Sequence, residues 1–227
     1  MFRDDFNSEG FLFIDQLIPA SEVKEALKTI QEMSANEYPP KLLSRQDIAT
    51  HPKVLKVLEH ENIFKLINNL LPRSFNENTT LPIINNKYPS IYPIPYKWLR
   101  AVPNGLFTGP HFDSYYLGNG SKNLITVWIP LTEVSIEMGS MQVIPRSHKN
   151  EKFNHLRDRK HTKDNDGTKD GWIDQELLIG EEWVTKHFLQ GDVCVLDINT
   201  LHKTCPNSTL NLRISCDTRW QPRSDKT

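Results

Sequence analysis

The C-terminal half of the sequence has the residue pattern of an all-β structure. From Lys97 onward, short apolar or alternating segments are separated by turn residues, and we expect these segments to form strands. The segments are KWLRAV, HFDSYYL, LITVWIPL, SMQVI, HFLQ, DVCVLDI and RISCDTRW. This succession of short strands restricts the C-terminal half to a closed or sandwiched β-structure.

The N-terminal half shows helical periodicity after a first strand signal, FLFI. An amphipathic helix is predicted after Pro19, with its apolar positions at Ala20, Val23, Ala26, Leu27, Ile30 and Met33. A second helical pattern ends before Pro72, and a shorter one precedes it at Val54, Leu55 and Leu58. Residues 73–96 are rich in Asn and Pro and are expected to form a long connection.

The chain is long enough to bury a proper core, so we expect a single domain over residues 1–227. Residues 1–96 would be a mostly helical elaboration, and residues 97–227 a β core with an inserted loop at about 150–187. Within that loop, half of residues 150–171 are charged. A charge run is usually a solvated loop, but loops of this length are often lids or binding segments, and both interpretations stay open.

Composition favours a small-molecule partner. Lys and Arg total 27 against 28 Asp and Glu, and no basic block indicates nucleic-acid binding. The first residues are acidic where a signal peptide needs basic ones, and no stretch resembles a membrane span. Three cysteines are too sparse for a disulfide framework, which fits a reducing interior. We therefore expect a cytoplasmic monomer or homodimer.

The segment GPHFDSYY, residues 109–116, contains the first candidate metal ligands. In an extended strand residues i and i+2 share a face, so His111 and Asp113 would converge while Phe112 turns away. A metal ion could sit at the point where they meet. Alone, the pattern also fits a surface strand whose polar residues face water.

The segment QGDVCVLDINTLHKTCPNSTLNLRISCDTRW favours the metal site. His202 follows its first strand in a turn, and Arg213 begins an alternating strand with a polar face. An inward arginine in such a structure requires a buried anion. Two histidines and a carboxylate form the facial triad expected for non-haem Fe(II), and a nearby arginine suits an acid cosubstrate. Zinc accepts the same ligands, but such an arginine has no obvious role in a simple zinc hydrolase.

At these residues the sequence resembles the phytanoyl-CoA dioxygenase family of Fe(II)- and 2-oxoglutarate-dependent oxygenases. The resemblance extends through EGFLFIDQLIPASEVKEAL, KWLRAVPNGLFTGPHFDSYYLGNG, VWIPLTEVSIEMGSMQVIPRSHK, GDVCVLDINTLHKTCPNS and LRISCDTRW. It implies a mainly β fold, a double-stranded β-helix or jelly roll, with the metal at its open end and N-terminal helices beside it. In the PRSH block Arg146 stands where the family usually has glycine, which leaves the geometry of that turn and of the pocket mouth open.

Position by position, the resemblance implies the iron ligands His111, Asp113 and His202. It implies that Arg213 binds the distal carboxylate of 2-oxoglutarate, that Thr204 supports that carboxylate, and that Trp128 lines the cosubstrate pocket.

Candidate substrate contacts are Tyr115, Tyr116, Arg100 and Arg219. Arg100, on the strand that leads to the HxD motif, would either meet an anionic substrate or form a salt bridge at the rim. Arg219 would face inward with Arg213. The alternative to a substrate contact is a structural ion pair between Arg219 and Asp217 that only connects strands.

The expected activity is that of an Fe(II)- and 2-oxoglutarate-dependent dioxygenase. It would hydroxylate an unactivated C–H bond of a small-molecule metabolite, with O2 as oxidant and decarboxylation of 2-oxoglutarate to succinate and CO2. The carboxylate of Asp113 favours hydroxylation over halogenation, and desaturation or cyclisation stays open. The alternatives are a non-catalytic jelly-roll sensor that binds a metal or an acid, and a zinc-dependent hydrolase. The sequence does not identify the substrate.

Overall fold

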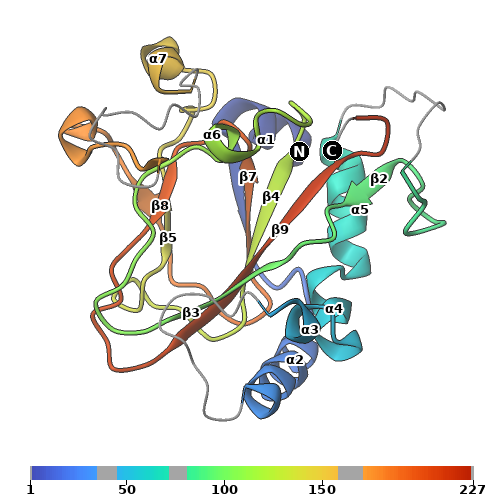
Figure 1. Cartoon of the computed structure of the whole chain (residues 1–227). Helices are drawn as coiled ribbons and strands as arrows, with labels where there is room; N and C mark the ends of the chain where they lie inside the picture. Colours follow the sequence, from blue (N-terminus) through green and yellow to red (C-terminus); the bar gives the residue numbers. More distant parts are fainter. Residues whose placement is uncertain (1, 35–44, 72–80, 158–170, 226–227) are drawn as a thin grey trace.

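The computed structural model describes residues 2–34, 45–71, 81–157 and 171–225. Two antiparallel β-sheets form its centre, and helices from the N-terminal half lie beside the larger sheet (Figure 1). In the described part of the chain, each helix is too short or too polar to cross a lipid bilayer.

The larger sheet has six strands in the order β1, β7, β4, β9, β2, with β3 also paired to β9. Their bounds are β1 (Phe11–Ile14), β2 (Ile91–Pro93), β3 (Trp98–Val102), β4 (Ile125–Pro130), β7 (Val193–Asp197) and β9 (Arg213–Pro222). Strand β9 is the long central element, because it pairs with β4 along one edge and with β3 and β2 along the other.

The smaller sheet has three strands in the order β6, β5, β8. Their bounds are β5 (Met141–Val143), β6 (Val184–Thr185) and β8 (His202–Thr204). A buried apolar cluster joins Trp128 and Leu196 of the larger sheet to Met141 and Val143 of the smaller one. The two sheets therefore pack face to face, with the side chains between them forming one part of the core.

Alternation along β4 divides the core into two parts. Ile125, Val127 and Ile129 belong to a cluster shared with the helices, whereas Trp128 belongs to the cluster between the sheets. A period of two therefore places apolar residues on both faces of this buried strand.

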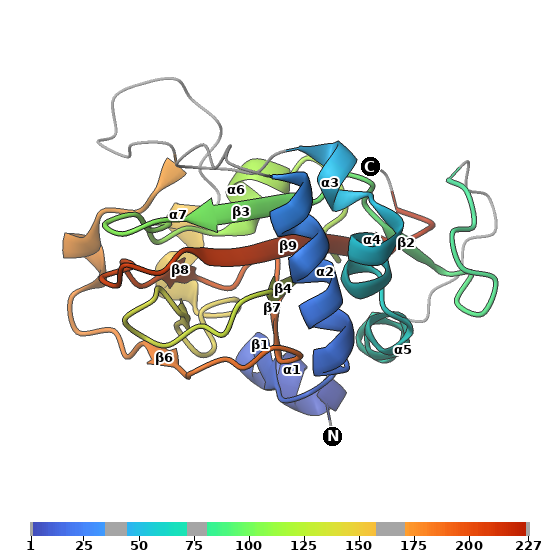
Figure 2. The same cartoon turned by 90° about the horizontal axis from the view of Figure 1, so that it is seen from below.

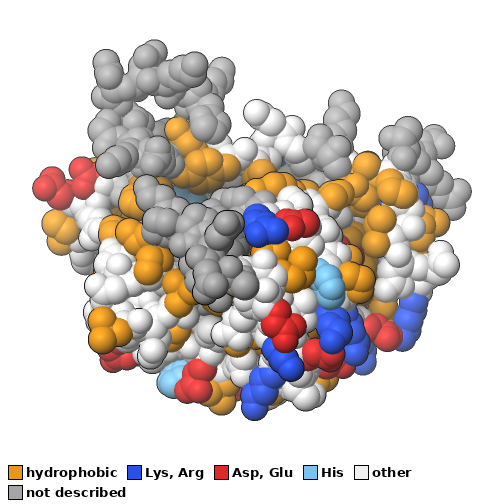
Figure 3. Space-filling view, turned by 60° about the horizontal axis from the view of Figure 1, so that its bottom comes forward, with side chains coloured by type: hydrophobic (Ala, Val, Ile, Leu, Met, Phe, Trp, Pro, Cys, Tyr) orange, Lys and Arg blue, Asp and Glu red, His pale blue; other side chains and the backbone are white. Residues whose placement is uncertain are grey.

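The helical layer covers the outer face of the larger sheet (Figure 2). It contains α1 (Phe2–Glu9), α2 (Ala20–Met33), α3 (Gln46–Ala49), α4 (Pro52–Leu58) and α5 (Glu61–Leu70). The helical patterns after Pro19 and before Pro72 thus correspond to α2 and α5. Ion pairs join α2 to α4, from Lys53 to Glu25 at 2.9 Å and from Lys56 to Glu22 at 3.3 Å. Figure 3 shows acidic and basic side chains intermixed on this side of the molecule.

Three local predictions are wrong. The HFDSYYL segment forms a helix, α6 (Asp113–Leu117), because Phe112 is buried ahead of it and Gly118 closes its single turn. The HFLQ segment contributes only isolated bridges, from Phe188 to Val134 and from Gln190 to Asp192. His202 lies at the start of β8 rather than in a turn.

The two long connections are described only in part. Residues 91–93 of the first form β2, whereas its residues 73–80 lie outside the described ranges. The second contains 3-10 turns at Glu151–Phe153 and Gln175–Leu178 and the helix α7 (Asn154–Arg157). Residues 158–170 of its charged segment are also outside the described ranges.

Candidate metal centre and adjoining cavities

Two histidines and one aspartate converge where the two sheets meet. His111 and His202 exchange backbone hydrogen bonds of 3.0 and 3.1 Å, so these two residues lie side by side. The Oδ1 atom of Asp113 is 3.7 Å from Nε2 of His111 and 4.0 Å from Nε2 of His202. One candidate ligand atom from each residue lies within 4.8 Å of the others, which is compact enough to hold one metal ion.

The backbone fixes the orientation of both imidazole rings. Nδ1 of His111 lies 2.8 Å from the carbonyl oxygen of Gly109, and Nδ1 of His202 lies 2.8 Å from that of Thr200. A carbonyl only accepts, so each Nδ1 carries the proton and each Nε2 presents a lone pair to the centre. Burial, together with the neighbouring His202, lowers the pKa of His111 to about 3. The neutral imidazole is the form that binds a metal.

The Asp113 carboxylate is buried and charged. Arg219 donates from Nη2 to Oδ1 at 3.2 Å, and the Thr126 hydroxyl donates to Oδ2. Burial alone would raise the pKa of Asp113, but the positive charge of Arg219 and the hydrogen bond from Thr126 contribute to holding it well below its usual range. The centre therefore offers one anionic and two neutral ligands.

Arg213 is a fully buried cation with unused hydrogen-bond donors. Its Nη1 donates to the carbonyl oxygen of Gly139, while Nε and Nη2 are buried and have no partner within the described residues. Burial, and secondly the like charge of Arg100, lower the pKa of Arg213 to about 10, so the guanidinium remains protonated at neutral pH. Unpaired buried donors on a cation are costly, and an anion placed there would satisfy them.

A narrow cavity connects Arg213 to the candidate metal ligands. Its lining includes His111, His202, Thr204, Trp128 and Arg213. The Thr204 hydroxyl oxygen accepts from the backbone N–H of Thr108 at 2.9 Å, which leaves its own proton available to donate. The structure thus brings the residues predicted for cosubstrate binding to one place.

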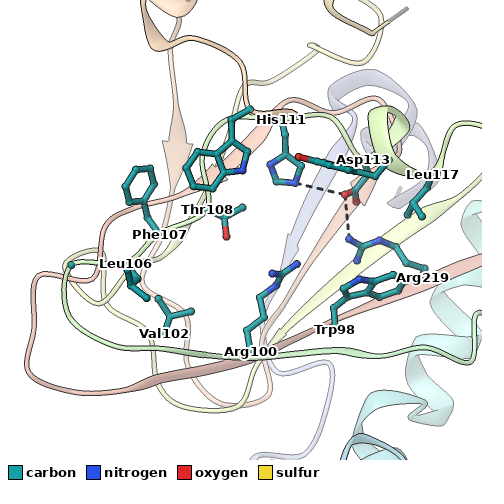
Figure 4. A pocket seen from close by; sticks show the side chains of 13 residues that line it. Trp98, Arg100, Val102, Leu106, Phe107, Thr108, His111, Asp113, Leu117 and Arg219 are labelled. Carbon is teal, nitrogen blue, oxygen red and sulfur yellow. Dashed lines mark hydrogen bonds and ion pairs between the residues drawn. The ribbon is translucent and has the colours of Figure 1, made fainter. Parts of the chain in front are cut away.

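A second, larger cavity of about 560 Å³ opens beside the same centre (Figure 4). Of the four predicted substrate contacts, Arg100, Arg219 and Tyr116 line it, and Tyr115 is not among its lining residues. Its remaining walls are largely apolar and come from Trp98, Val102, Leu106, Phe107, Leu117 and Trp172.

Arg100 and Arg219 form different ion pairs from the Asp217–Arg219 pair that the sequence suggested as an alternative. Asp217 accepts from Nε of Arg100 at 2.6 Å, and Arg219 pairs with Asp113 while its guanidinium lies 4.8 Å from the ring centroid of Trp98. No direct Asp217–Arg219 ion pair occurs among these described residues. Sequence reasoning missed Thr126, although alternation along β4 gives it the same inward face as Trp128.

Arg146 keeps the turn geometry that glycine favours. Its φ angle is +63°, in the left-handed region, and its backbone N–H donates to the carbonyl oxygen of Glu9 at 2.8 Å. The side chain is 73 % exposed, pairs with the Glu9 carboxylate at 3.1 Å and lines neither cavity. The substitution therefore leaves the turn intact and places the arginine on the surface.

Two imidazoles and a carboxylate, held between two antiparallel sheets beside a buried arginine, define the class of mononuclear non-haem iron oxygenases. The sequence profile of the phytanoyl-CoA dioxygenase (PhyH) family matches residues 6–215, so the chain belongs to this family. It is a dioxygenase of the kind that uses Fe(II), 2-oxoglutarate and O2, which confirms the predicted enzyme class and cofactors.

Similar proteins support the same fold. The 1-deoxypentalenic acid 11-beta-hydroxylase of Streptomyces exfoliatus is 26% identical over 223 residues, covering 95% of this chain and 70% of the relative. The epimerase SnoN from nogalamycin biosynthesis is 18% identical with a TM-score of 0.69, covering 98% of this chain and 83% of its own. The non-haem monooxygenase ThoJ is 18% identical with a TM-score of 0.66, covering 100% of this chain and 79% of its own. The two structures share the fold, and the predicted jelly roll is confirmed.

Proposed function

We propose that the protein hydroxylates an unactivated C–H bond of a small-molecule metabolite, with His111, Asp113 and His202 as the ligands of Fe(II). The bound metal and 2-oxoglutarate together supply the oxidising chemistry, in which O2 is consumed and succinate and CO2 are formed. The S. exfoliatus relative is named as a hydroxylase, which supports the reaction type. The retained carboxylate of Asp113 supports hydroxylation over halogenation.

The observation that carries the proposal is the pairing of this triad with Arg213. The two unpartnered donors of Arg213 match the distal carboxylate of 2-oxoglutarate, and Thr204 adds a hydroxyl donor to the same oxygen atoms. Trp128 is buried and lines the same narrow cavity. A hydrolytic zinc site would have no obvious use for such a cavity.

The test is the visible absorption band that an Fe(II)–2-oxoglutarate chelate gives without oxygen. Wild-type protein should develop the band anaerobically, and His202→Ala should lose it. Arg213→Gln should retain metal binding but bind 2-oxoglutarate about 10- to 100-fold more weakly, because a charge-assisted hydrogen bond is lost. Admitting O2 should release succinate.

Other outcomes would identify the alternatives. A wild-type protein that gives no band, or a His202→Ala variant that keeps it, would contradict the assignment of the ligands. Activity with zinc and without oxygen would indicate a hydrolase. A chelate that never forms succinate, with or without a substrate, would indicate a sensor.

A further inference from the structure

Arg100 is the more exposed of the two arginines that line the larger cavity. It lies on β3 opposite Ser215 of β9, and its side chain is 27 % exposed, against 6 % for Arg219. Within the described residues it donates only from Nε, to Asp217. Figure 4 shows its side chain extending into the cavity, so the two Nη groups are available to a bound molecule.

The other two arginines are more deeply buried and lie against the metal centre or the cosubstrate cavity. Arg213 lies at the closed end of the narrow cavity, where the proposed cosubstrate carboxylate would satisfy it. Arg219 donates from Nη2 to Asp113 and packs on Trp98, although its Nε and Nη1 atoms are buried and have no partner within the described residues. Arg100 is thus the most accessible cation for a molecule that enters the larger cavity.

The charge balance of the site favours an anion in that cavity. The charged groups that line the two cavities are Arg100, Arg213, Arg219, Lys203, Asp113 and Asp217. Four of these groups are cations and two are carboxylates, so positive charge is in excess. Fe(II) and the 2-oxoglutarate dianion bring equal and opposite charges, so their binding leaves this excess unchanged. A positive site with low-dielectric walls attracts anions and binds them strongly.

The cavity also limits the size and number of charges of this anion. Its volume of about 560 Å³ suits a single small molecule, and Phe107 and Trp172, with ring centroids 5.4 Å apart, contribute an aromatic wall. Because Asp217 already neutralises part of its charge, one guanidinium suits one carboxylate better than a polyanion.

We propose that Arg100 binds the carboxylate of the substrate, and that the substrate is a monocarboxylic acid with a compact apolar body. The inference rests on the proposed function, since it assigns Arg213 to 2-oxoglutarate. The apolar walls hold the body of the acid beside the metal centre, and the Nη groups of Arg100 fix the direction of its carboxylate.

The experiment compares acids with their own primary amides in the anaerobic enzyme loaded with Fe(II) and 2-oxoglutarate. The probes are 1-adamantanecarboxylic acid, 4-tert-butylbenzoic acid and dodecanoic acid, each against its amide, with affinities measured by titration calorimetry. The chelate band is recorded in the same samples, so that displacement of 2-oxoglutarate by an acid is detected. At least one acid should bind about tenfold or more tightly than its amide.

The decisive variant is Arg100→Gln/Asp217→Asn, which removes the cation without leaving an unpaired buried carboxylate. It should weaken acid binding about 10- to 100-fold and leave amide binding within about threefold. The matched control Arg146→Gln/Glu9→Gln removes an arginine–carboxylate pair on the surface and should preserve the preference for acids.

Two results would overturn the inference while leaving the proposed function standing. In the first, no acid binds the wild-type protein more tightly than its amide does. In the second, the decisive variant keeps the preference for acids. If the wild-type protein gives no chelate band, the proposed function is contradicted, and this inference with it.

Discussion

At the scale of single residues, the carboxylate of Asp113 is oriented by the protein itself. Thr126 on β4 donates to Oδ2, and Arg219 on β9 donates to Oδ1, so both oxygens are held from the larger sheet. Oxygen Oδ1 is the one that approaches both Nε2 atoms. Partners of this kind, which hold a ligand rather than the metal, commonly change metal affinity by about 10- to 100-fold.

Thr126→Val tests this orientation. Valine preserves the shape and the β-branch of threonine but removes the hydroxyl donor, so Oδ2 loses its partner and the carboxylate can rotate. The affinity for Ni(II), measured by calorimetric titration, should fall about 10- to 100-fold. Thr29→Val is the control, because the Thr29 hydroxyl donates to the carbonyl oxygen of Glu25 within α2. Equal metal affinity in wild type and Thr126→Val would show that Arg219 alone fixes the carboxylate.

At the scale of elements, the turn before β5 positions the arginine at the start of β9. Gly139 has a φ of +97°, and its carbonyl oxygen accepts from Nη1 of Arg213. A Cβ added at Gly139 would lie 2.9 Å from the carbonyl oxygen of Cys205 and 3.2 Å from Nη1 of Arg213. A side chain here would therefore press on the group proposed to bind 2-oxoglutarate.

Gly139→Ala should raise the KM for 2-oxoglutarate and lower the free energy of unfolding by about 1–2 kcal/mol, because alanine is strained in the left-handed region. The matched control is Gly180→Ala, since Gly180 has a φ of +84° and no atom within 4 Å of an added Cβ. The control has the same backbone strain without these close contacts, so it should lose less stability and keep an unchanged KM. Succinate formation at varied 2-oxoglutarate and chemical denaturation supply the two measurements. An unchanged KM in Gly139→Ala would show that this turn does not affect the binding of 2-oxoglutarate.

The elements also show which parts of the structure a sequence can predict. Period-two alternation along β9 predicts one inward face for Arg213, Asp217 and Arg219, and these three residues line the narrow cavity. The pairing of those side chains depends on the register of β3 and on the placement of α6, which lie far away in the chain. The sequence therefore indicated inward charges but not that Arg100 would pair with Asp217 and Arg219 with Asp113.

Helix α6 marks a second limit of sequence reasoning. The alternation in HFDSYYL suits a strand, but one helical turn follows Phe112 because that ring is buried with Phe153 and Leu156 of the inserted segment. Tertiary packing thus overrides the local pattern. By contrast, the predicted apolar stripe of α2 needs only local periodicity and a breaker at Pro19, and its helix begins directly after that residue.

At the scale of the whole molecule, the candidate metal centre joins the two sheets. His202 belongs to β8 of the smaller sheet, whereas Asp113 is held by strands β4 and β9 of the larger one. A metal bound by these residues would bridge the layers. It would bind the folded state far more tightly than the unfolded chain, in which His111 and Asp113 lie 89 or more residues before His202. Metal binding should therefore stabilise the entire fold and not only its own pocket.

Ni(II) is the suitable probe, because it accepts nitrogen and oxygen ligands and does not support turnover. At a free concentration of about 100 times its Kd, it should add about 2.7 kcal/mol to the free energy of unfolding. For a chain of this size that corresponds to a rise in Tm of about 5–10 °C. Excess EDTA should reverse the rise, and adding 2-oxoglutarate to the Ni(II) protein should increase it further. The measurement is thermal unfolding followed by circular dichroism.

Two variants separate the contributions to this stabilisation. In His202→Ala the ligand set is incomplete, so Ni(II) should leave Tm within about 1 °C of the metal-free value. In Arg213→Gln the triad is intact, so Ni(II) should still raise Tm, but 2-oxoglutarate should add little because its distal carboxylate has lost its cation. A rise in His202→Ala equal to that of wild type would place the metal elsewhere on the chain, and the bridge between the sheets would then have no role in the stability of the loaded enzyme.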